Sequence, residues 1–314
     1  MEVKRISTSS QNTVSGSQRP VDFESFVGQE PIKAVLKTAI ESAKLRAGEL
    51  GHILFSWSSG FGKTTLAGIL SKQMGSSLKV VTWYALSKPS ELVSVLNSLD
   101  VGDILFIDEI HRLKPTIEEV LYIAMEDFLI DMVMPEGWSL RLPINPFTLI
   151  GATTKPESLS QPMKNRFIYQ FHFMDYTPDE KKRILDQYLA FYGVKYEQNL
   201  ITDISKKVAP VPREIHNLAI KIRDYLVSKK IKILTSNDRT DFLAHTQIQD
   251  GGMMPIHSKY LEILEVADRP LGLKSLAIQL WVSEKTLEED IEPLLLKLCL
   301  LYTSDAADER SSVD

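Results

Sequence analysis

The chain has 314 residues, 44% of them hydrophobic and 25% charged, which is enough to form two or three domains that each bury a core. Its formal net charge of -5 gives no overall attraction to nucleic acid, so any such contact must come from a local basic patch. One cysteine, Cys299, excludes an internal disulfide and a zinc site built from cysteines.

The ends and the hydropathy of the chain bear on its location. The N-terminal residues 1–18 are polar and Ser-rich, which predicts a disordered tail and not a secretion signal. No apolar run approaches the roughly 20 residues that a membrane span needs. We therefore expect a cytoplasmic protein.

The first half of the chain alternates apolar runs with helical patterns. A helix is predicted at 31–47, where Pro31 suits the first turn and an apolar stripe follows. Another helix is predicted at 64–74. Strands are predicted at 52–56, 78–83, 103–108 and 147–154. Short buried strands that alternate with helices indicate a parallel sheet covered on both faces.

Beyond Thr177 the sequence has helical patterns only, which predicts a small all-α domain that ends near residue 246. The segment 247–255 is typical of a linker. The last part contains short amphipathic helices, and the stretch 273–295 is typical of a helix-turn-helix unit.

Residues 56–65, SWSSGFGKTT, nearly form a phosphate-binding loop, whose pattern is G-x-x-x-x-G-K-[ST]. Trp57 stands where the first glycine is usual, and Gly60 precedes the intact ending of Gly62, Lys63 and Thr64. Such a loop points backbone N–H groups at phosphates, and the following helix adds its positive end. In that role Lys63 would reach the β- and γ-phosphates of ATP, and Thr64 would ligate Mg²⁺. The alternative is a Ser/Gly turn that happens to precede a lysine.

An acidic pair follows another predicted strand. Asp108 ends the strand at 103–108, and Glu109 comes next. An aspartate in this place can hold the water shell of Mg²⁺, and the glutamate can orient an attacking water. Acidic pairs after strands are common by chance, so the pair indicates an ATPase only in combination with the loop.

Six stretches along the chain share the order of motifs in a known family. They are RPVDFESFVGQE (19–30), GFGKTTLA (60–67), ILFIDEIHRLKPTIEEVLYIAMEDF (104–128), PFTLIGATTKPESLSQPMKNRF (146–167), VPREIHNLAIKIRDY (211–225) and RPLGLKSLA…TLEEDIEPLL (269–295). With these stretches the chain resembles the AAA+ ATPases, and most closely the RuvB family of Holliday junction branch migration motors. The resemblance implies an α/β fold: a P-loop AAA+ ATPase domain with a parallel sheet at 19–177, an all-α lid at 178–246 and a C-terminal winged-helix domain at 247–301.

The resemblance also assigns roles to single residues. Thr154, beside Thr153, would sense the γ-phosphate, Arg166 would be the arginine finger that reaches the nucleotide of a neighbouring subunit, and Arg213 would be the lid arginine. The implied catalytic residues are Lys63, Asp108, Glu109, Thr154, Arg166 and Arg213. ATP or ADP would be bound by Arg19, Val27, Gly28, Gly60, Phe61, Gly62, Lys63, Thr64, Thr65, Tyr176, Pro212 and Arg213, and Mg²⁺ by Thr64 and, through water, Asp108. Without the family, Arg166 and Arg213 would be ordinary solvated or salt-bridged arginines.

The implied function is ATP-driven branch migration of Holliday junctions in DNA recombination, repair and the SOS response, by a homo-oligomeric ring that is expected to be a hexamer. Its partners would be duplex or junction DNA and a RuvA-type junction-binding protein, which would dock on a hairpin at 131–147. One alternative is another AAA+ remodelling ATPase of the clamp-loader type. A further alternative is a non-hydrolysing DNA-binding or scaffold protein with a degenerate ATP site, in which Trp57 is the lesion.

The C-terminal sequence departs from the family. Where the family has a basic wing, residues 299–314 read CLLYTSDAADERSSVD, and such an acidic segment repels a duplex. We therefore expect a truncated winged-helix domain, followed at 302–314 by a non-native or disordered tail.

Overall fold

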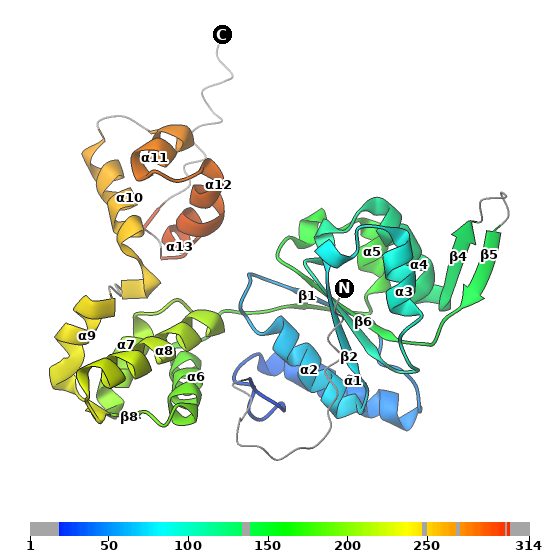
Figure 1. The fold of residues 1–314 in the computed structure, drawn as a ribbon, viewed down its shortest axis with the longest axis horizontal. Helices are drawn as coiled ribbons and strands as arrows, with labels where there is room; N and C mark the ends of the chain where they lie inside the picture. The colour runs from blue at the N-terminus through cyan, green and yellow to red at the C-terminus, as the bar shows by residue number, and fades with distance from the viewer. Residues whose placement is uncertain (1–18, 134–138, 247–249, 268–270, 299, 302–314) are drawn as a thin grey trace, which may run out of the picture. The chain divides into compact units, whose positions relative to one another are not determined.

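The chain divides into two compact units, Met1–Tyr176 and Thr177–Asp314, in a computed structural model (Figure 1). The structure describes residues 19–301 with the exception of 134–138, 247–249, 268–270 and 299. The tails predicted at 1–18 and 302–314 lie outside the described residues. Within the described residues, no helix is both long enough and apolar enough to cross a membrane.

A sheet of five parallel strands forms the centre of the first unit. Its strands lie in the order β2-β3-β6-β1-β7. Their bounds are β1 Ile53–Ser56, β2 Leu78–Thr82, β3 Ile104–Asp108, β6 Thr148–Thr153 and β7 Tyr169–His172. Every residue of β1 and β6 is buried, which explains why both sequences are continuous apolar runs. The four predicted strands and the parallel sheet are confirmed, whereas β7 was not predicted.

Helices cover both faces of this sheet. Figure 1 shows α1 and α2 on one side and α3, α4 and α5 on the other. Their bounds are α1 Glu30–Leu45, α2 Lys63–Met74, α3 Pro89–Leu96, α4 Pro115–Asp127 and α5 Gln161–Arg166. The core beneath α3 and α4 joins Leu92 and Leu121 to Ile107 of β3, all of them fully buried. The burial of each such side chain stabilises the folded state by about 1.5–3 kcal/mol and fixes the helices on the sheet.

A hairpin follows α4. Its strands β4 (Leu129–Val133) and β5 (Ser139–Pro143) pair antiparallel, with Asp131 opposite Arg141. The two side chains form an ion pair, with Arg141 Nε 2.8 Å from Asp131 Oδ1. The hairpin predicted at 131–147 is therefore present, and its tip at 134–138 lies outside the described residues.

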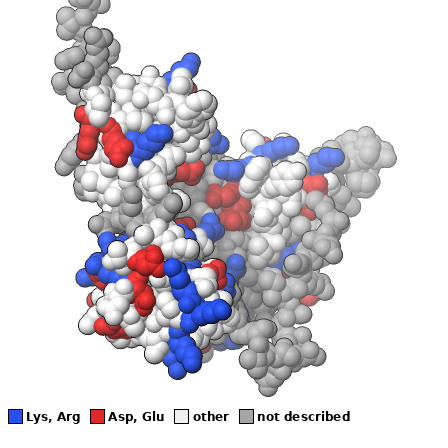
Figure 2. Space-filling view, turned by 60° about the vertical axis from the view of Figure 1, so that its left-hand side comes forward, with Lys and Arg blue, Asp and Glu red and all other residues white. Residues whose placement is uncertain are grey.

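The second unit begins with four helices. Thr177 caps the first of them, because its hydroxyl accepts from Glu180 N at 3.3 Å. The helices are α6 Pro178–Phe191, α7 Gln198–Lys206, α8 Pro212–Lys229 and α9 Arg239–Thr246. Figure 2 shows Lys and Arg side chains gathered on the face that these helices form, with acidic side chains among them.

The prediction that this segment contains helices only needs one correction. Two short strands, β8 (Lys195–Tyr196) and β9 (Ile233–Leu234), pair in parallel. Gly193 and Lys230 both adopt left-handed φ angles, 65° and 56°, just past the ends of α6 and α8. The two turns bring the following segments side by side, and two residues are too few for a sequence pattern to reveal a strand.

The C-terminal helices surround a small core of their own. They are α10 Pro255–Val266, α11 Leu273–Leu280, α12 Glu284–Thr286 and α13 Glu292–Lys297. Leu276, Leu287 and Leu295 belong to the core. The helical pair predicted at 273–295 is confirmed, but a π-helical turn at Leu287–Ile291 separates α12 from α13. Pro293 accounts for the break, since it has no N–H to donate to the preceding turn.

Candidate nucleotide-binding site

The loop between β1 and α2 has the backbone of a phosphate cradle. Gly60 and Gly62 adopt left-handed φ angles of 87° and 94°, a conformation that favours glycine. A Cβ atom at Gly62 would also lie 3.1 Å from the Phe26 ring. Position 62 therefore needs glycine, both for its backbone conformation and because the Phe26 ring leaves little space for a side chain. Thr64 and Thr65 follow in the first turn of α2.

Lys63 ties this loop to the sheet. Its buried ammonium donates to the carbonyl of Trp57, and to the carbonyls of Ser58 and Thr153 at 3.3 Å each. An ammonium group has three protons to donate, so these carbonyls hold it at the centre of the loop. The predicted phosphate ligand thus lies beside the end of β6.

Trp57 fits at the first loop position because its side chain packs against neighbouring aromatic rings. Its backbone N–H donates to the Thr153 carbonyl at 3.1 Å, while its φ angle of 144° is one that a tryptophan rarely adopts. The indole packs against His172 at 4.4 Å and Phe61 at 6.1 Å between ring centroids. Its buried Nε1 has no hydrogen-bond partner among the residues that the structure describes. The position accommodates the large side chain, but at the cost of backbone strain and an unsatisfied donor.

The acidic pair lies two strands from the loop, at the end of β3. Glu109 N donates to Asp108 Oδ1 at 3.1 Å, and Glu109 adopts a left-handed φ of 50°. Glu109 Oε2 accepts from the Thr154 hydroxyl at 2.9 Å. Because β6 lies between β1 and β3, the sheet brings the predicted glutamate and the predicted sensor threonine into direct contact.

His111 and Thr153 complete the arrangement, and the sequence analysis gave neither a role of its own. His111 Nδ1 lies 2.9 Å from Thr153 Oγ1 and 3.2 Å from Glu109 Oε2. Burial lowers the pKa of His111, and the Glu109 carboxylate opposes that shift. The histidine stays neutral near pH 7 and links the glutamate to the strand that contacts Lys63. The only sequence signal was its place two residues after Glu109.

The segment expected to line the adenine packs against the loop. Val27 and Gly28 are buried, and the side chain of Gln29 exchanges hydrogen bonds with the backbone of Met174 at 2.6 and 3.0 Å. The hydroxyl of buried Tyr176 donates to the Phe61 carbonyl at 3.2 Å. Arg19 is exposed. Pro212 and Arg213 begin α8 in the second unit.

Arg166 is the last residue of α5, and α4 holds its side chain. Its guanidinium donates to Pro162 O at 2.9 Å and to Glu126 Oε2 at 2.8 Å. It also lies over the Tyr122 ring, 4.7 Å from the centroid. About a quarter of the Arg166 side chain is exposed (26%), so the guanidinium stays accessible from outside the chain.

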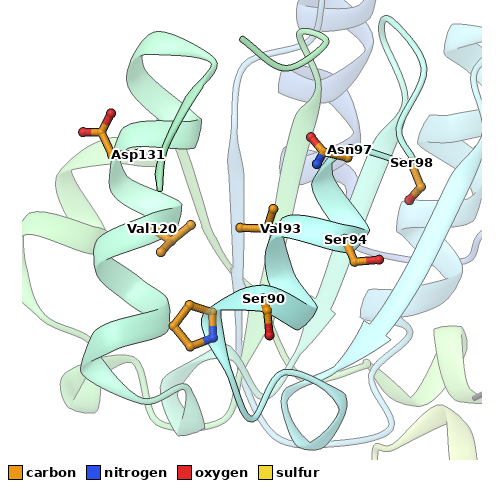
Figure 3. Close-up of a pocket in the computed structure, with 8 residues that line it drawn as sticks. Ser90, Val93, Ser94, Asn97, Ser98, Val120 and Asp131 are labelled. Atoms are coloured by element: carbon orange, nitrogen blue, oxygen red, sulfur yellow. The ribbon is translucent and has the colours of Figure 1, made fainter. Parts of the chain in front are cut away.

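A separate groove of about 610 Å³ opens between α3 and α4 (Figure 3). Val93 of α3 and Val120 of α4 face one another across it, and Asp131 of the hairpin lies at one end. The groove is lined by Pro89, Ser90, Val93, Ser94, Asn97, Ser98, Val120 and Asp131, none of which belongs to the predicted nucleotide site.

The site combines a glycine-bearing loop, which joins a buried strand to a helix, with an acidic pair and a threonine at the same end of the sheet. This combination defines a P-loop ATPase of the AAA+ class. The family description "Holliday junction DNA helicase RuvB P-loop domain" matches residues 18–173, and "RuvB C-terminal winged helix domain" matches 250–305. The chain belongs to the RuvB family.

Curated relatives agree along nearly the whole chain. The Holliday junction branch migration complex subunit RuvB of Campylobacter fetus subsp. fetus is 38% identical over 299 residues, 94% of this chain and 87% of the relative. The subunit of the same name from Campylobacter lari is 39% identical over 300 residues, 94% and 89% of the two chains.

Solved structures extend the comparison to the fold. The RuvB Holliday junction branch migration motor of Thermotoga maritima matches with a TM-score of 0.79 and 33% identity over 95% of this chain and 99% of that one. The FIGL-1 AAA domain in complex with ADP has a TM-score of 0.53 and 14% identity over 71% of this chain and 78% of that one, and thus shares the fold alone.

Proposed function

We propose that this chain is the ATP-driven motor subunit of Holliday junction branch migration. The observation that carries the proposal is that Lys63, Glu109, Thr153 and Thr154 meet at the end of β6. Similarity along nearly the whole chain to subunits that carry the name of the Holliday junction branch migration complex supports the Holliday junction as the substrate. Those names also favour the motor over the clamp-loader-type ATPase and over the non-hydrolysing scaffold.

The residues of the loop divide the work of binding ATP. Backbone N–H groups of the loop and the N-terminus of α2 would face the phosphates, and Lys63 would exchange its carbonyl partners for phosphate oxygens. The residues fit Mg²⁺, since the Thr64 hydroxyl and the Asp108 carboxylate are oxygen donors, and the ion would neutralise charge on the phosphates.

Hydrolysis needs a water held by a carboxylate and positive charge near the γ-phosphate. Glu109 would accept a hydrogen bond from the water, and Thr154, now bonded to Glu109, would sense the γ-phosphate. Arg166 would place positive charge at the nucleotide of a neighbouring subunit. Arg213, at the start of the lid helix α8, would report which nucleotide is bound. Val27, Gly28 and Tyr176 would line the adenine.

The proposed partners follow from the same assignment. Duplex DNA would meet the C-terminal domain, a RuvA-type protein would dock on the β4–β5 hairpin, and copies of the chain would form a ring, expected to be a hexamer. The cytoplasmic location predicted from the sequence belongs to this proposal as well.

Steady-state ATP hydrolysis with Mg²⁺, with and without four-way-junction DNA, tests the proposal. We expect turnover in the parent chain, stimulation by the junction, and a loss of about a hundredfold or more in Asp108→Asn. Asp127→Asn, which makes the same change at the exposed end of α4, serves as the control and should hydrolyse normally. A parent chain without turnover would favour the scaffold alternative, and turnover without stimulation would leave an ATPase that is not a DNA motor.

A further inference from the structure

We propose that Tyr122 is a positioning residue for Arg166, because it fixes both ends of the short helix that carries this arginine. The inference rests on the proposed function, in which Arg166 acts on the nucleotide of a neighbouring subunit. In this arrangement, one face of α4 orients the guanidinium of Arg166.

Tyr122 contacts Arg166 through its ring and its backbone. The guanidinium carbon lies 4.7 Å from the centroid of the Tyr122 ring, and Arg166 Nε donates to the Tyr122 carbonyl at 3.3 Å. Both contacts are with neutral groups, so they orient the guanidinium without neutralising its charge.

The tyrosine hydroxyl fixes the other end of α5. It donates to Glu118 Oε2 at 2.7 Å and lies 2.6 Å from Ser160 Oγ, which itself donates to Glu118 Oε2 at 2.9 Å. Ser160 is the N-cap of α5, where its hydroxyl accepts from Met163 N. Glu118 is 9% exposed, and a buried carboxylate requires such donors. The three side chains therefore lock the start of α5 to α4.

A helix of six residues does not hold its own direction in water, so its neighbours must set it. Glu118, Tyr122 and Glu126 recur every four residues and thus lie on one face of α4. The Arg166–Glu126 ion pair is partly exposed and contributes at most about 1 kcal/mol. Tyr122 is the member of the face that contacts both Ser160 at the start of α5 and Arg166 at its end.

Rings mixed from two kinds of subunit separate this role from general stability. Donor subunits carry Asp108→Asn and keep the finger, and acceptor subunits carry Arg166→Ala and keep their own hydrolytic residues. Turnover in the mixture then requires Arg166 of a donor at the nucleotide of an acceptor. Tyr122→Phe is introduced into the donor alone or into the acceptor alone, and it removes the hydroxyl while keeping the ring beneath Arg166.

We expect kcat to fall about tenfold with the substitution in the donor, and kcat in the acceptor arm and KM in both arms to stay within about twofold. Tyr196→Phe in the donor is the control, because it removes a tyrosine-to-carboxylate hydrogen bond of 2.7 Å, to Asp186, far along the chain. Ser160→Ala in the donor is a second variant that opens the same lock, and it should reproduce the kcat loss.

Each other outcome overturns the inference. Equal losses in both arms would show a structural role, and no loss in the donor arm for either variant would show that the lock does not direct Arg166. If the parent chain hydrolyses ATP but the mixture of donor and acceptor does not, Arg166 does not act in trans. A parent chain without turnover would instead overturn the proposed function, and the inference with it.

Discussion

The indole of Trp57 packs edge to face against the imidazole of His172, with ring centroids 4.4 Å apart and ring planes inclined by 74°. His172 ends the edge strand β7, and its Nδ1 lies 3.1 Å from the hydroxyl of Ser56. This contact holds the large side chain against the end of the edge strand β7. The loop therefore tolerates a residue that its usual pattern excludes.

The strain at Trp57 is measurable by comparing two truncations. Trp57→Gly and Trp57→Ala both remove the indole, but only glycine relaxes the φ angle of 144°. We expect the glycine variant to be the more stable by about 1–2 kcal/mol, although alanine is favoured in ordinary backbone. Urea unfolding of the two variants side by side gives the difference, and an alanine variant of equal or greater stability would show that the backbone here is not strained.

Trp281 also has a positive φ angle, but its side chain is exposed. It follows α11 with a left-handed φ of 58°, and the residue is 92% exposed. Glycine is the preferred residue at such a helix end, so we expect Trp281→Gly to stabilise the C-terminal helices by about 1 kcal/mol. Thermal unfolding measures the gain, with Trp281→Ala as the matched variant, and a less stable glycine variant would contradict the prediction.

His111 is expected to matter for hydrolysis through Glu109. His111→Ala removes the contact of 3.2 Å to the Glu109 carboxylate and the contact of 2.9 Å to Thr153. We expect kcat for ATP to fall about tenfold with little change in KM, because the glutamate loses its fixed orientation. His245→Ala, a histidine of α9 in the second unit, is the control. Steady-state kinetics at pH 7.5 settles the point, and an unchanged kcat would remove His111 from the site.

The same histidine makes stability depend on acid pH. Burial lowers the pKa of His111 below its ordinary value of 6.5, so the unfolded chain binds the proton first as the pH falls. The contribution of neutral His111 to the free energy of unfolding is therefore complete above pH 6.5, and it decreases as the pH falls below that value. The free energy of unfolding should fall between pH 7 and about pH 5.5, and by less in His111→Asn. Equal slopes for the two proteins would contradict the assignment.

Two tyrosines of the second unit should make the stability depend on alkaline pH. Burial, together with hydrogen bonds to Asp186 and Asp241, raises the pKa of Tyr196 and of Tyr225 from 10.0 to about 12. The unfolded chain loses these protons first, so stability should fall as the pH rises from 10 to 12. Tyrosinate absorbance during a pH titration reports all ten tyrosines, and Tyr196→Phe should remove one late step. A titration complete near pH 10 would show that neither burial nor the hydrogen bonds raise the pKa of these tyrosines.

The sequence predicted those features of the site that depend on short stretches of chain. The loop, the acidic pair and the four predicted strands are each encoded within about ten residues, where apolar runs and glycine spacing are informative. The contact between Glu109 and Thr154 depends on β6 lying beside β3, and strand order is not readable from either segment alone. The positive φ of Trp57 was likewise visible only in the structure, because the residue type argues against it.

The strand β7 was not predicted, and its position in the sheet explains why. β7 lies at the edge of the sheet, where the half-buried Tyr169 and Phe171 alternate with the exposed Gln170 and His172. An edge strand of four residues with such alternation carries no continuous apolar run. It is nevertheless the strand that supplies His172 to Trp57.

The tryptophan in the loop also gives the protein an optical property. Its indole lies against an imidazole, and its carbonyl accepts a hydrogen bond from Lys63, the residue that would turn to the phosphates. Indole fluorescence depends on polarity and on neighbouring rings, so a shift of Lys63 away from the carbonyl would alter the emission of Trp57. The emission of this one of the chain's four tryptophans would thus be an intrinsic, label-free signal at the point where ATP would enter.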